Sequence, residues 1–163
     1  MTISHMIKLS EKSEKHLALH FGNSKSAGSV FFTEVFANPS ELLQYVNSCE
    51  PSETIAQTGN REALIFHMAE AVGNSGIIQR SHVLPENTIV ESRNGFQVEV
   101  VLLKQLELTY EFCVIVETAD GESHVITAFP GSYSLPFPYK GQGKEEFEKS
   151  ILFWQEYILC RKA

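Results

Sequence analysis

The most regular pattern of apolar and polar residues lies on either side of two short turns. The segments concerned are residues 88–91 and 96–100 around Asn94-Gly95, and residues 110–117 and 124–129 around Asp120-Gly121. Asn-Gly and Asp-Gly dipeptides favour the left-handed conformations of tight turns, and the flanking residues are typical of strands. We therefore expect two hairpins and an antiparallel sheet that covers much of residues 86–130.

Two helices are expected before this sheet. The first spans residues 10–19, because Ser10 or Ser13 can cap its first turn and acidic residues follow. It would end at Gly22. The second begins at Asn38, whose side chain can accept a hydrogen bond from the first turn, and the proline that follows is tolerated there. The residues of this helix that would face the core are Leu42, Leu43 and Val46.

Two further segments differ in how clearly their apolar residues indicate a helix or a strand. Residues 29–36 are aromatic and β-branched, which favours a strand. Residues 61–72 fit the helical and the strand period equally well, so both alternatives stay open.

The C-terminal part combines a proline-punctuated loop with an amphipathic helix. Apolar residues recur there at spacings of four, three and four, which predicts a helix that packs on the sheet. They are Phe147, Ile151, Trp154 and Ile158. In the loop, aromatic residues beside Lys140 offer a platform on which unpaired bases can stack, although such residues more often only fix a loop in place. These aromatic residues are Tyr133, Phe137 and Tyr139.

The expected fold class is α+β, with N-terminal helices, a central antiparallel sheet of hairpins and a C-terminal amphipathic helix. The chain fits a single domain, residues 1–163, that can bury a normal core. No apolar run approaches the ~18 residues that a membrane span requires, so no membrane partner is expected. The first residues show no secretory signal, and we expect a cytoplasmic protein.

The net charge of −7 restricts the partners. An acidic protein repels polyanions as a whole, so a nucleic-acid site would have to be local. The same charge suits a protein that binds a basic partner. One function hypothesis is therefore a non-catalytic protein-binding module, for example a toxin-neutralising immunity protein or a scaffold protein.

Cysteines and histidines give little sign of a metal site. Cys49, Cys113 and Cys160 form an odd set without CxxC spacing, so we expect reduced, buried thiols. His16 and His20 are four residues apart, so both imidazoles can face one way on the first helix and serve acid–base chemistry. Zinc would need further ligands, and no HExxH motif or Cys/His cluster is present. We expect neither metal nor cofactor.

Three short segments give a resemblance to a known family. They are His16-Leu17-Ala18-Leu19-His20-Phe21-Gly22, Phe31-Phe32-Thr33-Glu34 and Val125-Ile126-Thr127-Ala128-Phe129-Pro130-Gly131. In this order they resemble the ribonuclease A-like toxin domains of bacterial contact-dependent inhibition and other polymorphic toxin systems. In that family a histidine precedes a small apolar residue and glycine, a serine/threonine-phenylalanine-threonine-acid segment follows, and a terminal strand ends in threonine, any residue, tyrosine, proline.

The resemblance implies a ribonuclease-like core at about residues 10–131, followed by a loop and helix at residues 132–163. It implies metal-independent cleavage of single-stranded RNA or tRNA, with full or reduced activity, so RNA is the expected partner. The residues it assigns to catalysis are His20 for proton transfer and Thr127 and Lys25 on the phosphate side. Those it assigns to substrate contact are His16, Phe129 and Tyr133.

Two departures from the family pattern bear on this chemistry. The family has an arginine on the helix after its glycine, where this chain offers only Lys25, a point charge without a bidentate fork. Phe129 stands where the family has tyrosine, so the ring is kept and the hydroxyl is lost. Tyr133 is the candidate substitute.

Thr127 also has a purely structural interpretation. On a regular strand it shares a face with Val125 and Phe129, whereas His124 points to the opposite face. Threonine is common in strands because it is β-branched. Both interpretations stay open.

Overall fold

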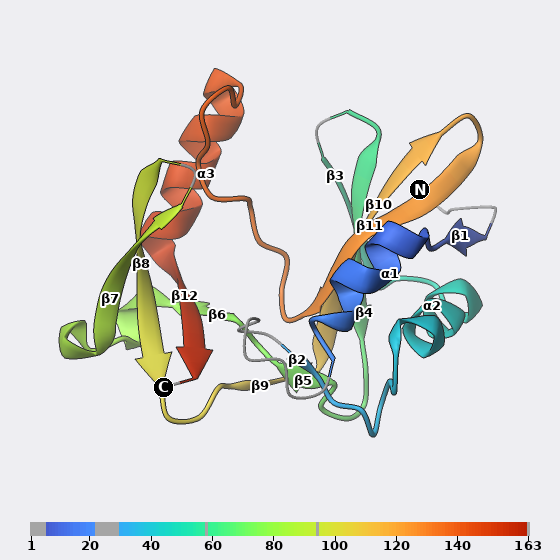
Figure 1. Ribbon diagram of the computed structural model, residues 1–163, viewed down its shortest axis with the longest axis horizontal. Coiled ribbons are helices and arrows are strands. Elements are labelled where there is room, and N and C mark those ends of the chain that lie inside the picture. The colour runs from blue at the N-terminus through green and yellow to red at the C-terminus, as the bar shows by residue number, and fades with distance from the viewer. Residues whose placement is uncertain (1–5, 22–29, 58, 94, 163) are drawn as a thin grey trace.

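The computed structural model describes residues 6–21, 30–57, 59–93 and 95–162 (Figure 1). In this part of the chain the fold is α+β, with three α-helices and three mostly antiparallel sheets, which confirms the expected class. None of these helices is long and apolar enough to cross a membrane.

The first sheet has five strands and carries two short helices on one face (Figure 1). In spatial order its strands are β1 (Ile7–Lys8), β11 (Glu122–Pro130), β10 (Glu111–Ala119), β4 (Arg61–His67) and β3 (Glu53–Ala56). The helices are α1 (Glu11–Ala18) and α2 (Pro39–Ser48). The β10–β11 hairpin is confirmed, with positive φ angles of 53° at Asp120 and 78° at Gly121. Strand β4 resolves the ambiguity in favour of a strand for residues 61–67, whereas residues 68–72 form neither a helix nor a strand.

Capping side chains fix where both helices begin. The Oγ atom of Ser10 accepts a hydrogen bond from the Ser13 amide at 3.1 Å, and Oδ1 of Asn38 accepts one from the Glu41 amide at 3.0 Å. These bonds satisfy donors that a helix leaves unpaired at its start. Both predicted helix starts are confirmed, and Gly22 lies outside the described residues.

An aromatic cluster fills the space between the first sheet and its helices. Phe112 of β10 is fully buried and stacks on Phe66 of β4, with ring centroids 5.0 Å apart. The rings of Phe31, Phe36 and Tyr45 surround it at 5.8, 5.6 and 6.1 Å. Large rings contribute much buried apolar area, so Phe112 is the centre of this core.

The second sheet has four strands and contains the other hairpin. In spatial order they are β6 (Ile77–Gln79), β12 (Tyr157–Lys162), β8 (Phe96–Leu103) and β7 (Thr88–Arg93). The β7–β8 hairpin is confirmed with Gly95 at φ 83°, and Asn94 lies outside the described residues. The prediction of one central sheet over residues 86–130 is wrong, because β8 pairs with the C-terminal strand β12 while β10 pairs with β4.

The C-terminal helix is shorter than its apolar stripe predicts. Helix α3 (Lys144–Glu156) ends before Ile158, which is a fully buried residue of β12. Pairing with β6 and β8 thus outweighs the helical period at the end of the chain. The helix contacts the second sheet rather than the single central sheet on which it was expected to pack, since the rings of Phe147 and Phe96 of β8 lie 5.9 Å apart.

A small third sheet joins the two larger ones (Figure 1). Its strands are β2 (Val30–Phe31), β5 (Gly73–Asn74) and β9 (Leu108–Thr109). The strand expected over residues 29–36 is therefore mostly wrong, since a turn at residues 33–35 follows β2. The backbones of β2 and β5 approach closely at Gly73, where a Cβ atom would lie only 2.2 Å from the Val30 carbonyl oxygen.

The three cysteines are free thiols in different environments. Cys113 and Cys160 are buried as expected, whereas Cys49 is exposed at the end of α2, so the expectation is wrong for that residue. Burial raises the pKa of the Cys113 and Cys160 thiols to about 12. Both therefore stay protonated at neutral pH.

The Phe112→Ala substitution should lower the free energy of unfolding by about 3–5 kcal/mol, because it deletes a buried ring with four aromatic neighbours. Urea denaturation followed by circular dichroism measures this change. Leu152→Ala is the matched control, since Leu152 is 65% exposed and its truncation should change stability by less than about 0.5 kcal/mol. A loss below about 1 kcal/mol for Phe112→Ala would contradict its central place in the core.

Candidate functional site

A cleft lies between the first and second sheets, beside the end of α1 and the end of β11. Its volume is about 360 Å³, within the range of small-ligand sites. Its lining comes from α1 and the residues after it, the β5–β6 turn with the start of β6, the end of β11 with the segment after it, and strands β7 and β12. The side chains there that can carry chemistry are His16, His20, Arg93, Arg161, Ser132 and Ser134.

Two imidazoles from the α1 region lie on the first-sheet side of the cleft. His16 is in the last turn of α1 and His20 follows the helix, with ring centroids 5.9 Å apart and ring planes at 74°. Leu17 between them is 1% exposed, and its burial in the core fixes the rotation of α1 about its axis. The His20 carbonyl accepts a hydrogen bond from the Phe31 amide at 2.6 Å, which holds the segment after the helix in place.

Two arginines from the second sheet contribute to the same cleft. Arg161 of β12 forms an ion pair with Glu91 of β7. Arg93, at the end of β7, places its guanidinium group over the Phe137 ring, 5.1 Å from the centroid. Both guanidinium groups are therefore held by a neighbour rather than free to rotate.

Two backbone segments complete the lining. Gly131, after β11, has a φ of 115°, and a Cβ atom there would lie 3.1 Å from Oγ of Ser75. The Cys160 amide of β12 donates a hydrogen bond to the Gly76 carbonyl at 2.9 Å. Because Arg161 follows Cys160 directly, this hydrogen bond holds its strand against the β5–β6 turn.

The charge of the cleft differs from that of the whole chain. Its described lining includes two arginines and two histidines but no aspartate or glutamate. The chain as a whole has 20 acidic and 13 basic residues. The lining is thus locally basic compared with the chain as a whole, although Glu91, outside the lining, offsets part of the charge of Arg161. A local basic site is the condition that the net charge sets for a nucleic-acid site.

The structure brings three of the six predicted site residues into this cleft. They are His16, His20 and Phe129. Thr127 lies two residues before Phe129 on β11, half-buried, and is not among the described lining residues. The Tyr133 hydroxyl accepts a hydrogen bond from Gln57 at 3.1 Å, and its ring lines a different cavity. Lys25 lies outside the described residues.

A bulge in β11 changes the faces that its residues occupy. Thr127 pairs with Ile115 of β10, whereas Val125 pairs with the residue next to Ile115, so β11 has one extra residue here. Val125 packs in the core beneath the helices, while Phe129 packs on the opposite face. The expectation that Val125 shares a face with Thr127 and Phe129 is wrong, because alternation does not continue through a bulge. His124 pairs two positions beyond Ile115, so it lies on the face of Thr127, also against expectation.

Sequence reasoning missed the residues that the second sheet and the loop supply. Arg93 precedes a hairpin turn and Arg161 lies on the unpredicted strand β12, so no spacing relates either of them to His20. Ser132 and Ser134 lie in the loop after β11, where only the prolines gave a local signal. The turn chemistry predicts the hairpin that carries Arg93 but not its position beside α1.

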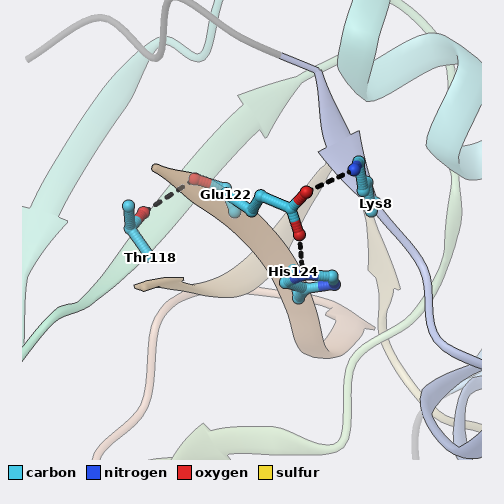
Figure 2. Close-up of polar contacts among 5 residues, drawn as sticks. Lys8, Thr118, Glu122 and His124 are labelled. Atoms are coloured by element: carbon cyan, nitrogen blue, oxygen red, sulfur yellow. Dashed lines mark hydrogen bonds and ion pairs between the residues drawn. The ribbon is translucent and has the colours of Figure 1, made fainter. Parts of the chain in front are cut away.

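Glu122, at the start of β11, belongs to a separate polar cluster (Figure 2). Its carboxylate accepts a hydrogen bond from Lys8 Nζ at 2.8 Å and lies 3.3 Å from Nε2 of His124. The hydroxyls of Thr118 and Ser123 are 2.7 Å apart beside it. Hydrogen bonds from Lys8 and from His124 hold the pKa of Glu122 below its ordinary value. The cluster ties β1 to β11 and none of its residues lines the cleft, so we assign it a structural role.

Neither a metal-binding group nor a similar known protein gives further information on the cleft. Among the described residues, no group of three or more His, Cys, Asp or Glu side chains could hold a metal ion. Comparisons with protein-family models, curated proteins and solved structures found no match to this chain. The resemblance to ribonuclease A-like toxin domains therefore stays a prediction based on the sequence motifs.

The Lys8→Met substitution should raise the pKa of Glu122, because the hydrogen bond from Lys8 is the largest of the interactions that lower it. NMR titration of the carboxyl carbon measures the shift. A pKa that is depressed in the folded state stabilises the fold above the pKa of the unfolded chain, and this contribution is lost as the pH falls through the folded pKa. The stability difference between wild type and Lys8→Met should therefore shrink in acid.

Lys12→Met is the control for this titration, since Lys12 is exposed on α1 and is not part of the cluster. An unchanged Glu122 pKa in Lys8→Met would contradict the assigned contact.

Proposed function

We propose that the chain is a metal-independent endoribonuclease that cleaves single-stranded RNA or tRNA in the cleft between its two larger sheets. The observation that carries this proposal is the pair His16 and His20, with rings 5.9 Å apart, in a cleft that holds two arginines and no described carboxylate. Imidazoles accept and donate protons near neutral pH, and guanidinium groups bind phosphate. The ordered motifs that resemble the toxin family support the same function.

RNA cleavage without a metal needs two proton transfers at one phosphodiester. One imidazole accepts the proton of the ribose 2′-hydroxyl as the 2′-oxygen attacks phosphorus. The other donates a proton to the 5′-oxygen as the bond between phosphorus and that oxygen breaks. The products are a 2′,3′-cyclic phosphate and a free 5′-hydroxyl. In this proposal His20 takes the acid–base role that the resemblance implies, and His16, exposed on the same side of the cleft, takes the second.

The phosphate also needs groups that bind its developing negative charge. Arg93 supplies a guanidinium fork, which binds two phosphate oxygens at once as a lysine cannot. Arg161 keeps one nitrogen on Glu91 and contributes its other nitrogens to the phosphate. The two arginines take the place of the arginine that the family motif has and this chain lacks. The hydroxyls of Ser132 and Ser134 take the phosphate-side role that the resemblance gives to Thr127.

Cleavage of a fluorogenic single-stranded RNA in excess EDTA tests the proposal. Wild-type protein should cleave it, and His16→Ala and His20→Ala should each lower kcat/KM by about 10²- to 10⁴-fold, the usual contribution of a positioned acid or base. An RNA with a 2′-deoxyribose before the scissile phosphate should resist cleavage, because it lacks the attacking hydroxyl.

His82→Ala is the matched control, since His82 is exposed on the 3-10 helix η1 (Arg80–His82) and does not line the cleft. Circular dichroism establishes that each variant is folded. Activity that persists in both cleft variants would contradict the assigned site. A folded wild-type protein without activity would overturn the proposal and favour the non-catalytic protein-binding module.

A further inference from the structure

A second groove lies on the second sheet, where the β7–β8 hairpin meets the start of α3. Its volume is about 450 Å³. We call it the hairpin groove, and the side chains that define it are three aromatic rings and two lysines: Phe96, Tyr139, Phe147, Lys140 and Lys144. Its described lining, like that of the cleft, contains no aspartate or glutamate, which is unexpected for a surface site on a chain with a net charge of −7.

The cations and rings of the hairpin groove are available to a ligand. Neither Lys140 nor Lys144 forms an ion pair with any residue that the structure describes. By contrast, Lys149 on the same helix pairs with Glu145 at 3.3 Å. Tyr139 is 44% exposed, so a face of its ring can receive a planar group.

Of the loop residues that the sequence offers as a stacking platform, only Tyr139 and Lys140 belong to this groove. Phe137 instead stacks on Trp154 with ring centroids 4.0 Å apart, and Arg93 covers it. Tyr133 lines a different cavity. In the hairpin groove, Phe96 and Phe147 supply the rings that Phe137 and Tyr133 do not. Both rings are half-buried, and the angle between their planes is 52°.

The hairpin groove and the cleft adjoin each other through one pair of residues. Arg93 and Phe96 are directly opposite in the register of β7 and β8, so their side chains lie on the same face of the sheet. Arg93 lines the cleft, and Phe96 lines the groove. Figure 1 shows this hairpin beside α3, the helix that supplies the other wall. A polymer that leaves the cleft past Arg93 therefore reaches the groove next.

We propose that the hairpin groove binds the unpaired bases and phosphates of a single-stranded RNA segment that continues from the cleft. Aromatic rings stack on unpaired bases with little sequence preference, and lysines attract the phosphates. A duplex hides its base faces, and an acidic peptide would use the lysines but not the rings. The inference rests on the proposed function, because the bound segment is the continuation of the strand in the cleft.

Fluorescence anisotropy with 2′-O-methyl oligoribonucleotides, which lack the attacking hydroxyl, tests the groove separately from cleavage. A decanucleotide should bind more tightly than a trinucleotide. Tyr139→Ala should weaken decanucleotide binding by about tenfold and leave trinucleotide binding unchanged. The double variant Lys140→Gln/Lys144→Gln should reduce the slope of log Kd against log salt concentration by about 1.4, which is about 0.7 for each lost phosphate contact.

Lys12→Gln/Lys104→Gln is the matched control, because both lysines are exposed, neither forms an ion pair with a described residue and neither lines the hairpin groove. Equal affinity for both lengths, or unchanged decanucleotide binding in the groove variants, would overturn the groove proposal and leave the proposed function intact. If neither RNA binds, the cleft does not hold RNA, and both proposals are overturned. Binding of polyglutamate together with no binding of either RNA would identify an acidic peptide as the ligand and overturn both proposals.

Discussion

The position of β12 between β6 and β8 is the constraint on which the rest of the structure depends. Without this strand, β7 and β8 would be an isolated hairpin, which is marginally stable in water. The same strand carries Arg161 into the cleft, and its Cys160 amide bonds to the Gly76 carbonyl beside the end of β11. The chain must therefore pass from β11 back to the second sheet through the loop and α3. Figure 1 shows this return path. It supplies lining residues to both sites, Ser132 and Ser134 to the cleft and Tyr139 and Lys144 to the hairpin groove.

The charged groups of this protein are unevenly distributed over its described residues. Several carboxylates are paired with cations away from the cleft, as in the ion pairs of Glu117 with Arg61 and Glu122 with Lys8. The described linings of the cleft and of the hairpin groove contain cations and rings but no carboxylate, and the carboxylate that pairs with a lining residue, Glu91 with Arg161, lies outside the cleft lining. An acidic chain can thus attract a polyanion locally while its remaining surface repels it. Such a distribution of charge would favour the binding of short single-stranded RNA segments at these two sites over nonspecific binding of RNA along the rest of the surface.

The sequence predicts those features that short-range physics decides. Ser10 and Asn38 mark helix starts because capping is a local hydrogen bond, and Asp120-Gly121 marks a hairpin because its backbone angles are local. The sharing of strands between sheets depends on contacts far apart in the chain, so neither the split into separate sheets nor the strand at Ile158 was predictable. The residues of the cleft likewise divide into those that a local pattern predicts and those that long-range strand pairing brings there. The histidine pair is four residues apart and was predicted, whereas the two arginines reach the cleft only through the pairing of β7, β8 and β12.

The most direct test of the account is to follow the histidine ring signals by NMR while an uncleavable 2′-O-methyl trinucleotide is added. Two of the six histidines, His16 and His20, line the cleft, and the other described ones lie elsewhere: His67, His82 and His124. The account predicts that the signals of His16 and His20 shift with increasing RNA while those of the other three stay in place. Shifts at the other three with none at His16 and His20 would place the RNA on a different surface and contradict the account.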